Sequence, residues 1–389
     1  MTLTKDPQSK SVFIRFSFLL CFGLIFYFLR VLPSPKLDLE VYLQAARNAL
    51  VDSSLIYKNN RDVFLYPPQA AWLFIPFTWI KNTTVIKSLW YAINLFMSAV
   101  LIRKSWVAFA AFFILSRYAT INFYYGQVNL LVLMLSISSH QLHQRKNSLW
   151  AAAILATNTI IKIFPGLYVV NWFIEKKWKL ILCYSSFLFL ILMSPFLIHG
   201  FTSGMELYRD MLGALAHKDF TLYSHNQSIQ AFIARFLSGQ SFDLFSVARV
   251  NWSIAAWPEI WIKLSAFSIG LGLSFLAWRK AARRGLPWDG LSAFFFTFLF
   301  ISPLVWKTYF IFLFPVWLQI FYHFEKAIFK KGEFYGFVLV TFFLSPDVVG
   351  FPLATRLDAL CIHLWGAAIT LKLWLALPQA SNNSESIQV

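Results

Sequence analysis

The sequence predicts an all-α, polytopic integral membrane protein. Of its 389 residues, 58% are hydrophobic, 19% are aromatic and only 13% are charged, which is more apolar surface than a water-soluble core could cover. Its long runs of Phe, Leu and Ile show no period-two alternation of the kind that marks a membrane β-barrel. Because lipid offers no partner to an exposed backbone amide, these runs must be helices.

Taken in order, the apolar runs predict about twelve membrane crossings. The first run, residues 12–32, is too long for the core of a signal peptide and is not followed by a small-residue cleavage site, so we expect a retained anchor. Several later runs hold fewer than the ~20 apolar residues of a full crossing and need polar flanks or neighbouring helices. The predicted crossings are 12–32, 88–102, 105–118, 127–140, 149–161, 163–174, 180–199, 259–278, 289–302, 308–324, 334–346 and 356–375.

Residues 67–80 are apolar but are interrupted by Pro67, Pro68 and Pro76. Proline removes a helical hydrogen bond and breaks a continuous helix. A full crossing here would also place Arg103 and Lys104 on the wrong side of the membrane. We therefore expect a re-entrant or half-inserted segment.

The net charge of +17 is concentrated in short basic connections, a pattern typical of cytoplasmic turns and not of a nucleic-acid partner. This orientation places both termini in the cytoplasm and two long loops, residues 33–66 and 200–258, outside. No Gly/Ser-rich linker divides the chain, so we expect a single domain over residues 1–389. The basic positions are Lys5, Lys10, Arg15, Arg103, Lys104, Arg145, Lys146, Lys176, Lys177, Lys179, Arg279, Lys280, Arg283, Arg284, Lys326, Lys330, Lys331 and Lys372.

The three cysteines, Cys21, Cys183 and Cys361, lie far apart in apolar runs. This scattering indicates neither a disulfide framework nor the ligand spacing of a metal site.

The first outer loop contains LDLEVYLQAARNAL, which predicts a short amphipathic helix opened by Asp38. One face of that helix would carry Leu39, Tyr42, Leu43, Ala46 and Leu50, and the sequence FLYPP would then return the chain to the membrane. A carboxylate just outside a bilayer is well placed for chemistry on lipid-linked substrates. Ionisable groups near lipid are functional candidates by default.

Other polar residues fall at the outer ends of the predicted helices, on the side of Asp38. We expect them to line one outward-facing cavity together with Asp38. They are Gln127 and Asn129, Lys162, His225, Asn226, Gln227 and Arg235, and Trp306 with Lys307.

Each candidate also has a purely structural interpretation. Asp38 can cap its helix, and Lys162 can extend its ammonium group from a helix end toward water. The amides of Gln127 and Asn129 can join helices through hydrogen bonds, and His225 can be an ordinary loop residue. Three Asn-X-Ser/Thr sequences, at Asn82, Asn226 and Asn251, are short enough to occur by chance.

In their order and spacing, these fragments resemble glycosyltransferase family 87, whose polytopic members belong to the GT-C superfamily. The lysine at position 307 departs from the family, which usually shows histidines after the Ser-Pro and Trp. The resemblance rests on Asp38 with Tyr42, Tyr57, Tyr66-Pro67-Pro68, Gly126-Gln127 with Asn129, Lys162 with Pro165, Asn226-Gln227-Ser228 with Arg235, and Ser302-Pro303 before Trp306.

The resemblance implies a GT-C fold and an inverting transfer of a hexose, with mannose the first candidate, from a polyprenyl-phosphate-linked donor. The acceptor would be a lipid or glycan at the outer face of a bacterial-type cell membrane. Such a reaction needs a base for the acceptor hydroxyl, for which we choose Asp38, and cations for the departing phosphate, for which we choose Lys162, Lys307 and Arg235. The predicted substrate-binding residues are Glu40 (the reserve base), Tyr42, Tyr66, Gln127, Asn129, His225, Asn226, Gln227 and Trp306.

No DxD-like pair occurs in the outer loops, which favours a reaction without a metal ion. The other candidate functions are a transporter or flippase of a lipid-linked saccharide, which would bind the same groups without making a bond, and an inactive scaffold. Transporters commonly consist of repeated halves. This chain shows no such repeat, and transport does not explain the acid in the first outer loop.

Overall fold

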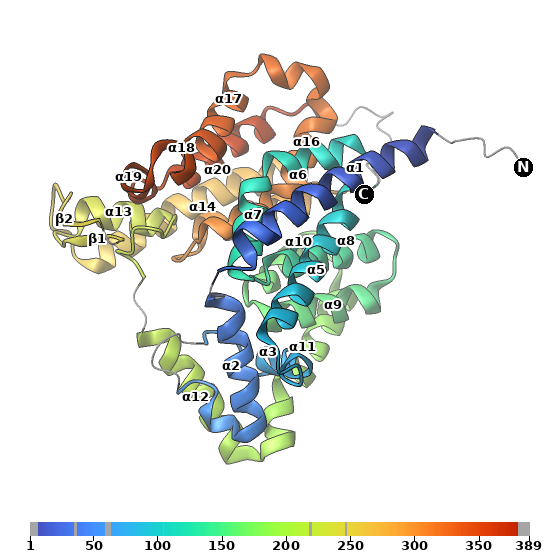
Figure 1. The fold of residues 1–389 in the computed structure, drawn as a ribbon, viewed down its shortest axis with the longest axis vertical. Helices are drawn as coiled ribbons and strands as arrows, with labels where there is room; N and C mark the ends of the chain where they lie inside the picture. The colour runs from blue at the N-terminus through green and yellow to red at the C-terminus, as the bar shows by residue number, and fades with distance from the viewer. Residues whose placement is uncertain are drawn as a thin grey trace, which may run out of the picture. The chain divides into compact units, whose positions relative to one another are not determined.

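The computed structural model describes residues 7–34, 37–58, 64–103, 105–217, 220–245 and 247–379, and 77% of it is helical (Figure 1). The predicted all-α class is confirmed. Within the described residues, the strands β1 (Phe242–Leu244) and β2 (Ala248–Val250) pair to form a two-stranded antiparallel sheet. Lys5 and Lys104 of the basic clusters lie outside them.

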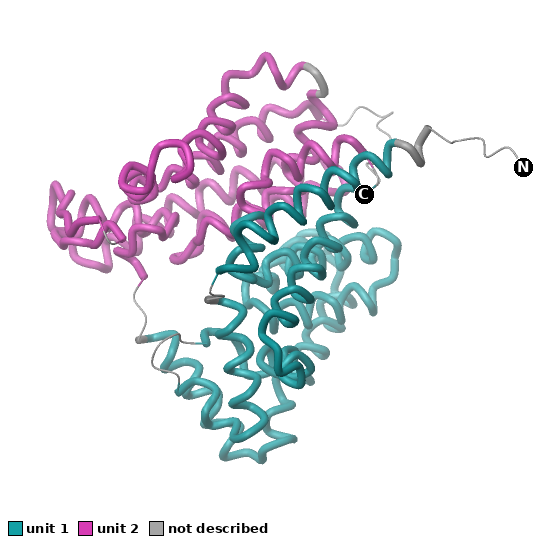
Figure 2. The backbone as a smooth tube through the Cα atoms, in the orientation of Figure 1, with its two compact units in different colours: residues 1–103, 120–218 teal, residues 104–119, 219–389 magenta. Residues whose placement is uncertain are grey.

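The chain forms two compact units, coloured separately in Figure 2. Unit 1 comprises residues 1–103 and 120–218, and unit 2 comprises residues 104–119 and 219–389. Helix α7 (Ser116–Tyr125) passes from unit 2 into unit 1. The expected single domain over the whole chain stays a prediction.

Unit 1 contains mainly helices. Its elements are α1 (Pro7–Phe26), the π turn η1 (Tyr27–Val31), α2 (Leu37–Val51), η2 (Ser53–Leu55), α3 (Pro68–Trp72), α4 (Ile75–Thr78), α5 (Thr83–Ile102), the end of α7, α8 (Asn129–Gln144), α9 (Ser148–Ile161), the 3₁₀ turn η3 (Phe164–Tyr168), α10 (Val169–Ile174), α11 (Trp178–His199) and α12 (Phe201–His217).

Unit 2 consists of helices and the small sheet. Its elements are α6 (Trp106–Ile114), the start of α7, α13 (Ile229–Leu237), β1, β2, α14 (Glu259–Arg284), α15 (Asp289–Ile301), the 3₁₀ turn η4 (Lys307–Leu313), α16 (Phe314–Phe324), η5 (Glu325–Lys330), α17 (Gly332–Val338), the π turn η6 (Leu339–Phe343), α18 (Pro346–Val349), α19 (Phe351–Ala359) and α20 (Ile362–Leu375).

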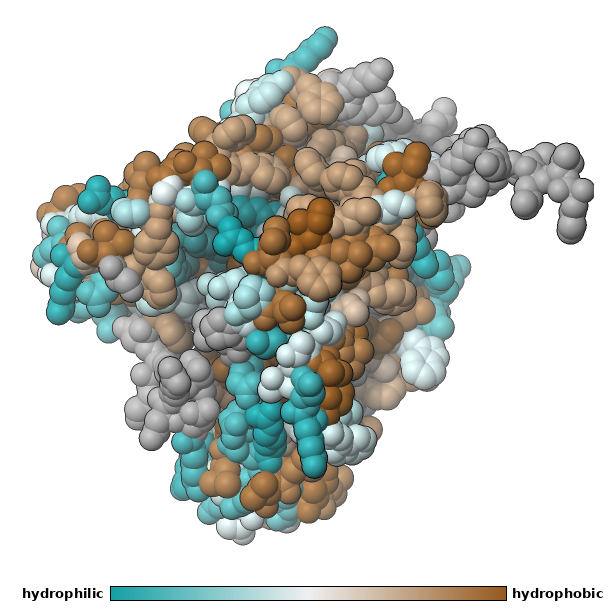
Figure 3. Space-filling model, viewed as in Figure 1, coloured by the Kyte–Doolittle hydropathy of each residue, from teal (hydrophilic) through white to brown (hydrophobic). Residues whose placement is uncertain are grey.

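By length and composition, 4 helical segments of the described chain can cross a membrane: Ser11–Val31, α5, α11 and α14. The number rises to 6 if the bent pairs α6 with α7 and α19 with α20 each form one span. Apolar side chains cover much of the face seen in Figure 3, and α1 exposes Phe13, Ile14 and Ile25. These features confirm the membrane class, while the count of about twelve crossings stays a prediction.

Helix α2 is the amphipathic helix expected in the first long loop. Leu39, Tyr42, Leu43 and Ala46 are buried as predicted, with the Tyr42 ring stacked on Phe74 at 4.8 Å. Leu50, which was predicted on the same face, is 53% exposed. Leu50 lies in the last turn of α2, which ends at Val51, and its exposure shows that the apolar contact does not extend to the end of the helix.

The segment 67–80 folds as α3 and α4, helices of 5 and 4 residues. Neither helix is long enough to cross a hydrocarbon layer of about 30 Å. The prolines divide the segment into two short helices, because Pro68 lies in the first turn of α3 and Pro76 in the first turn of α4.

In unit 2, α14 packs closely on α15 through a stripe of small residues. A Cβ atom added at Gly270 would lie 2.4 Å from the carbonyl oxygen of Phe300, so only glycine allows this approach. Small residues at such positions let helix backbones approach closely in membranes. The buried stripe consists of Ala266, Gly270, Ser274, Ala277 and Ala281.

We therefore expect Gly270→Ala to force α14 and α15 apart and to lower the free energy of unfolding by about 1–3 kcal/mol. Gly272 on the same helix has open space around its added Cβ. Gly272→Ala is the matched control and should leave stability unchanged or raise it by up to about 1 kcal/mol. Equilibrium denaturation in mixed micelles measures both variants, and equal stability of the two would contradict this packing.

Candidate active site

In unit 1, a turn between α7 and α8 brings a glutamine onto Asp38. Gly126 occupies this turn with φ of 65°, a left-handed conformation that favours glycine, and a Cβ there would lie 2.8 Å from Cβ of Leu39. Trp90 fixes the turn by donating its indole N–H to the Gly126 carbonyl oxygen at 3.0 Å. The next residue, Gln127, donates its side-chain N–H to Oδ2 of Asp38. The glycine thus allows α2 and the turn to meet at the carboxylate.

Asp38 is half-buried and lies at the second position of α2, which begins at Leu37. A carboxylate in the first turn of a helix also interacts favourably with the helix dipole. The structural and chemical interpretations of Asp38 are therefore compatible with one another.

Lys162 follows the last residue of α9 in an extended conformation, outside the candidate membrane spans. Its ammonium group donates to Oδ1 of Asn129, and Asn129 donates in turn to Oδ1 of Asn122 at 2.8 Å. Lys162 is 4% exposed. Burial lowers the pKa of Lys162 to about 7, and the negative charge of Asp38 opposes this shift. The acid of the first long loop and the cation at the end of α9 therefore interact electrostatically.

Two tyrosines complete this group. The hydroxyl oxygens of Tyr42 and Tyr66 lie 2.9 Å apart, and Nζ of Lys162 lies 6.0 Å from the ring centre of Tyr66. Burial raises the pKa of Tyr66, so its hydroxyl stays neutral. Tyr57 holds the segment by donating to the Tyr66 carbonyl oxygen at 2.8 Å.

Unit 1 thus brings together six predicted site residues. They are Asp38, Tyr42, Tyr66, Gln127, Asn129 and Lys162. Glu40 is exposed and forms an ion pair with Arg47 at 2.7 Å, a contact separate from the Asp38 group.

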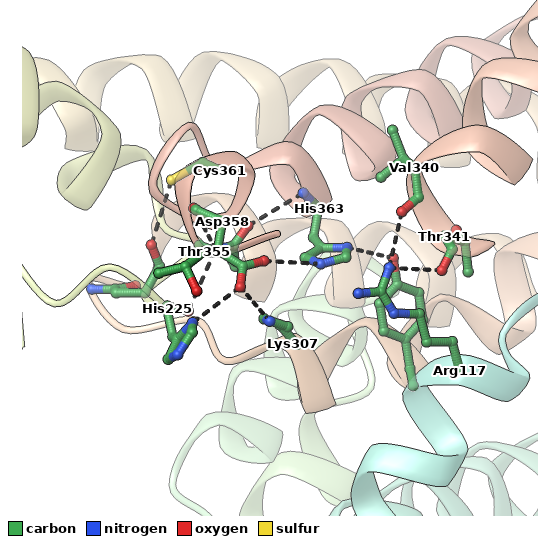
Figure 4. Close-up of polar contacts among 12 residues, drawn as sticks. Arg117, His225, Lys307, Val340, Thr341, Thr355, Asp358, Cys361 and His363 are labelled. Carbon is green, nitrogen blue, oxygen red and sulfur yellow. Dashed lines mark hydrogen bonds and ion pairs between the residues drawn. The ribbon is translucent and has the colours of Figure 1, made fainter. Parts of the chain in front are cut away.

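In unit 2, Lys307 and His225 converge on Asp358 (Figure 4). Lys307 forms an ion pair with Oδ2 of Asp358, and Nδ1 of His225 lies 3.1 Å from the same oxygen. The other carboxylate oxygen is 3.5 Å from Nε2 of His363, whose Nδ1 lies 3.0 Å from the hydroxyl of Tyr118. Three segments distant in sequence therefore meet at a single carboxylate.

Arg235, predicted to bind a phosphate, is fully buried and donates to groups of the protein itself. Its Nη1 donates to the Ala359 carbonyl oxygen at 2.6 Å and to Sγ of Cys361 at 3.1 Å. Its Nη2 donates to the carbonyl oxygens of Tyr223 and Asn226, both at 2.6 Å. These contacts use four of the five N–H groups of the guanidinium.

Asn226 and Gln227 are fully buried and hold the same loop. Asn226 donates to the Pro303 carbonyl oxygen at 2.9 Å and accepts from the Val305 N–H at 3.1 Å. Gln227 donates to the Asp358 carbonyl oxygen at 2.8 Å. Burial of Asn226 also removes the surface exposure that a glycosylation acceptor needs.

Trp306 is half-buried beside the loop. Its ring centre lies 5.6 Å from those of Phe220 and Tyr223, in edge-on geometry in both cases. Trp306 therefore forms part of an aromatic wall next to Lys307.

Sequence reasoning missed Asp358 and His363. Both lie in the apolar segment predicted as the crossing 356–375, and an ionisable residue inside such a segment is itself a functional signal. That signal was present in the sequence.

The fold defines an integral membrane protein of helical type, in which an acid and a buried lysine of unit 1 interact electrostatically. The chain matches the family model of glycosyltransferase family 87 over residues 64–306 and belongs to that family, which confirms the predicted resemblance and identifies a glycosyltransferase. No curated protein and no solved structure matches the chain. Asp38, Lys307 and Asp358 lie outside the matched residues, so their roles rest on geometry and chemistry.

Because Arg235 joins α13, its preceding loop and the α19–α20 connection, we expect Arg235→Met to leave several buried acceptors unpaired. The free energy of unfolding should fall by at least about 3 kcal/mol. Arg249→Met, at an exposed position of β2 in the same unit, is the matched control. Denaturation in mixed micelles measures the difference, and a fully stable Arg235→Met protein would refute this structural role.

Proposed function

We propose that this glycosyltransferase moves a hexose, with mannose the first candidate, from a polyprenyl-phosphate-linked donor to a hydroxyl group of a lipid or glycan acceptor, with inversion at the sugar. The proposal includes about twelve crossings, cytoplasmic termini and an active site at the outer face of a bacterial-type cell membrane. The observation that carries it is that Asp38, which accepts a hydrogen bond from Gln127, interacts electrostatically with the buried Lys162 within unit 1.

The proposed chemistry is a single displacement at the anomeric carbon. Asp38 accepts the proton of the acceptor hydroxyl while that oxygen bonds to the anomeric carbon. The bond from this carbon to the phosphate oxygen breaks, and the polyprenyl phosphate leaves with the electron pair. Gln127 orients the carboxylate through the hydrogen bond that it donates.

The leaving phosphate gains negative charge, so a preorganised cation near it stabilises the transition state. Lys162 is our candidate for this cation in unit 1, and Lys307 is a separate candidate in unit 2. Arg235, Asn226 and Gln227 are assigned to holding the loop that carries His225, because their side chains bind groups of the protein. Tyr66 and Trp306 present aromatic rings of the kind that stack on sugars.

The replacement Asp38→Asn should remove the base and keep the shape of the side chain. We expect the turnover number to fall by about 10² to 10⁴ while donor binding is retained. Glu206→Gln, which changes an exposed carboxylate on α12 of the same unit, is the matched control and should retain full activity. Turnover is measured with radiolabelled polyprenyl-phosphate hexose and purified protein; retained turnover in Asp38→Asn would place the base elsewhere.

The same assay separates transfer from transport. A transferase releases free polyprenyl phosphate and labels the acceptor, whereas a flippase or transporter of a lipid-linked saccharide returns the donor intact. Recovery of intact donor, with binding but no product, would favour the transport function.

Lys162 predicts a specific pH dependence. Burial lowers the pKa of Lys162 to about 7, so the side chain is cationic below that pH and becomes neutral as pH rises through it. Above this pH, the protonated fraction of Lys162 falls about tenfold for each further pH unit. KM for the donor should therefore rise as the pH rises. In Lys162→Arg, the cation persists and KM should stay flat from about pH 6 to about pH 9. A flat profile in the unmodified protein would contradict the role of Lys162.

We also propose that the reaction proceeds without a metal ion. Within the part of the chain that the structure describes, no group of three or more His, Cys, Asp or Glu side chains could hold one. Transfer should continue in the presence of EDTA. Complete loss in EDTA, restored by Mn²⁺ or Mg²⁺, would reject this part of the proposal.

A further inference from the structure

The carboxylate of Asp358 lies behind the basic groups that surround it. Its side chain is 3% exposed, while those of Lys307 and His225 are 17% and 20% exposed. His363, on the other carboxylate oxygen, is fully buried. The acid is therefore interior, and two of its three basic partners reach the surface of unit 2.

This arrangement orients hydrogen-bond donors. Oδ2 of Asp358 receives both Nζ of Lys307 and Nδ1 of His225, so one oxygen fixes the position of two basic side chains. An ammonium group has three N–H donors and the contact with Asp358 requires one of them. With Nδ1 directed at the carboxylate, Nε2 of His225 is the ring nitrogen that can meet a ligand.

The surroundings suit an anion that carries a large organic group. The ring of His225 lies 5.5 Å from Tyr223 and 4.8 Å from Phe245, and Trp306 lies next to Lys307 in the chain. Aromatic side chains exclude water and strengthen charge–charge interactions. Lys307 balances the charge of Asp358, and Nε2 of His225 adds a second polar atom for an anionic ligand.

We propose that Asp358 is a positioning residue that holds Lys307 and His225 together as a two-donor site for a phosphate group. The proposal rests on the proposed function, in which that phosphate belongs to the lipid-linked donor. Asp358 itself touches no substrate and acts through its two partners.

A purely structural role for Asp358 makes a different prediction. The backbone of this segment is held by Gln227, which binds the Asp358 carbonyl oxygen, and by Arg235, which binds the Ala359 carbonyl oxygen. Loss of the carboxylate charge therefore leaves these anchors in place. A structural acid would affect unfolding, whereas a positioning acid affects phosphate binding in protein that is still folded.

The experiment measures equilibrium binding to the purified full-length protein in detergent, with farnesyl phosphate, farnesol and inorganic phosphate as probes. We expect farnesyl phosphate to bind and farnesol not to bind, because the phosphate is the recognised group. Competition by inorganic phosphate would support a site for free phosphate, and lack of competition would support a lipid source. Equal binding of farnesol and farnesyl phosphate would overturn the proposal.

In Asp358→Asn, the affinity for farnesyl phosphate should fall by about tenfold or more, which is the effect expected from the loss of one charge-assisted hydrogen bond. Lys307→Gln should show a similar loss, and the double replacement should add little to either, because the residues act as one unit. Asp243→Asn and Lys263→Gln, at exposed positions of unit 2, are the matched controls. If Asp358→Asn fails to fold, Lys307→Gln decides the matter, because the Lys307 side chain is partly exposed, and unchanged binding in it would overturn the proposal.

Kinetics distinguish this site from the base. Asp358→Asn should raise KM for the donor and lower kcat only to the extent that Lys307 stabilises the leaving phosphate, whereas loss of the base lowers kcat and leaves KM for the donor unchanged. If the protein binds farnesyl phosphate in an Asp358-dependent way but transfers no sugar, the proposed function fails and this site remains. If transfer occurs and Asp358→Asn leaves KM unchanged, the site fails and the proposed function remains.

Discussion

The constraint on which this structure depends is the free-energy cost of an unpaired charge in an apolar interior. In the described chain, the buried ionic groups of the two sites are bound by other groups of the protein. Lys162 donates a hydrogen bond to Asn129 and interacts electrostatically with Asp38, and Arg235 donates to three backbone carbonyl groups. Asp358 has three basic side chains around it. These pairings connect segments that are distant in sequence, so the requirement to neutralise charge also fixes which loops and helix ends meet.

The same requirement separates residues that hold the fold from residues that present groups to a ligand. Arg235, Asn226 and Gln227 carry the donors and acceptors expected of a sugar- or phosphate-binding site, yet all three are fully buried and bind the protein itself. His225 and Lys307 come from the adjoining segments and are partly exposed. The first group makes the loop rigid, and a rigid loop is what allows the second group to present donors in a fixed geometry.

In unit 1, the carboxylate of Asp38 and the side chain of Lys162 interact electrostatically. A buried lysine with a pKa near 7 changes charge close to physiological pH, so the protein can provide a cation there without a permanent buried charge. Membership of glycosyltransferase family 87 supplies the reaction class. In the transfer that we propose, Asp38 and Lys162 would serve the two charge changes, the gain of a proton by the base and the gain of negative charge by the leaving phosphate.

The sequence by itself determined the helical membrane class and the apolar face of α2, because these depend on composition and on contacts between near neighbours in the chain. It also identified Asp38 and Lys162 as unusual polar residues at the ends of apolar runs. It did not predict that Leu50 is exposed, because periodicity defines the apolar face of a helix and does not show how far along that face the packing neighbours extend. Only the tertiary structure decided that Gln127 meets Asp38 across 89 positions and that His225 meets Asp358 across 133. Such pairings follow from long-range packing around a glycine turn or a buried carboxylate, which no local pattern encodes.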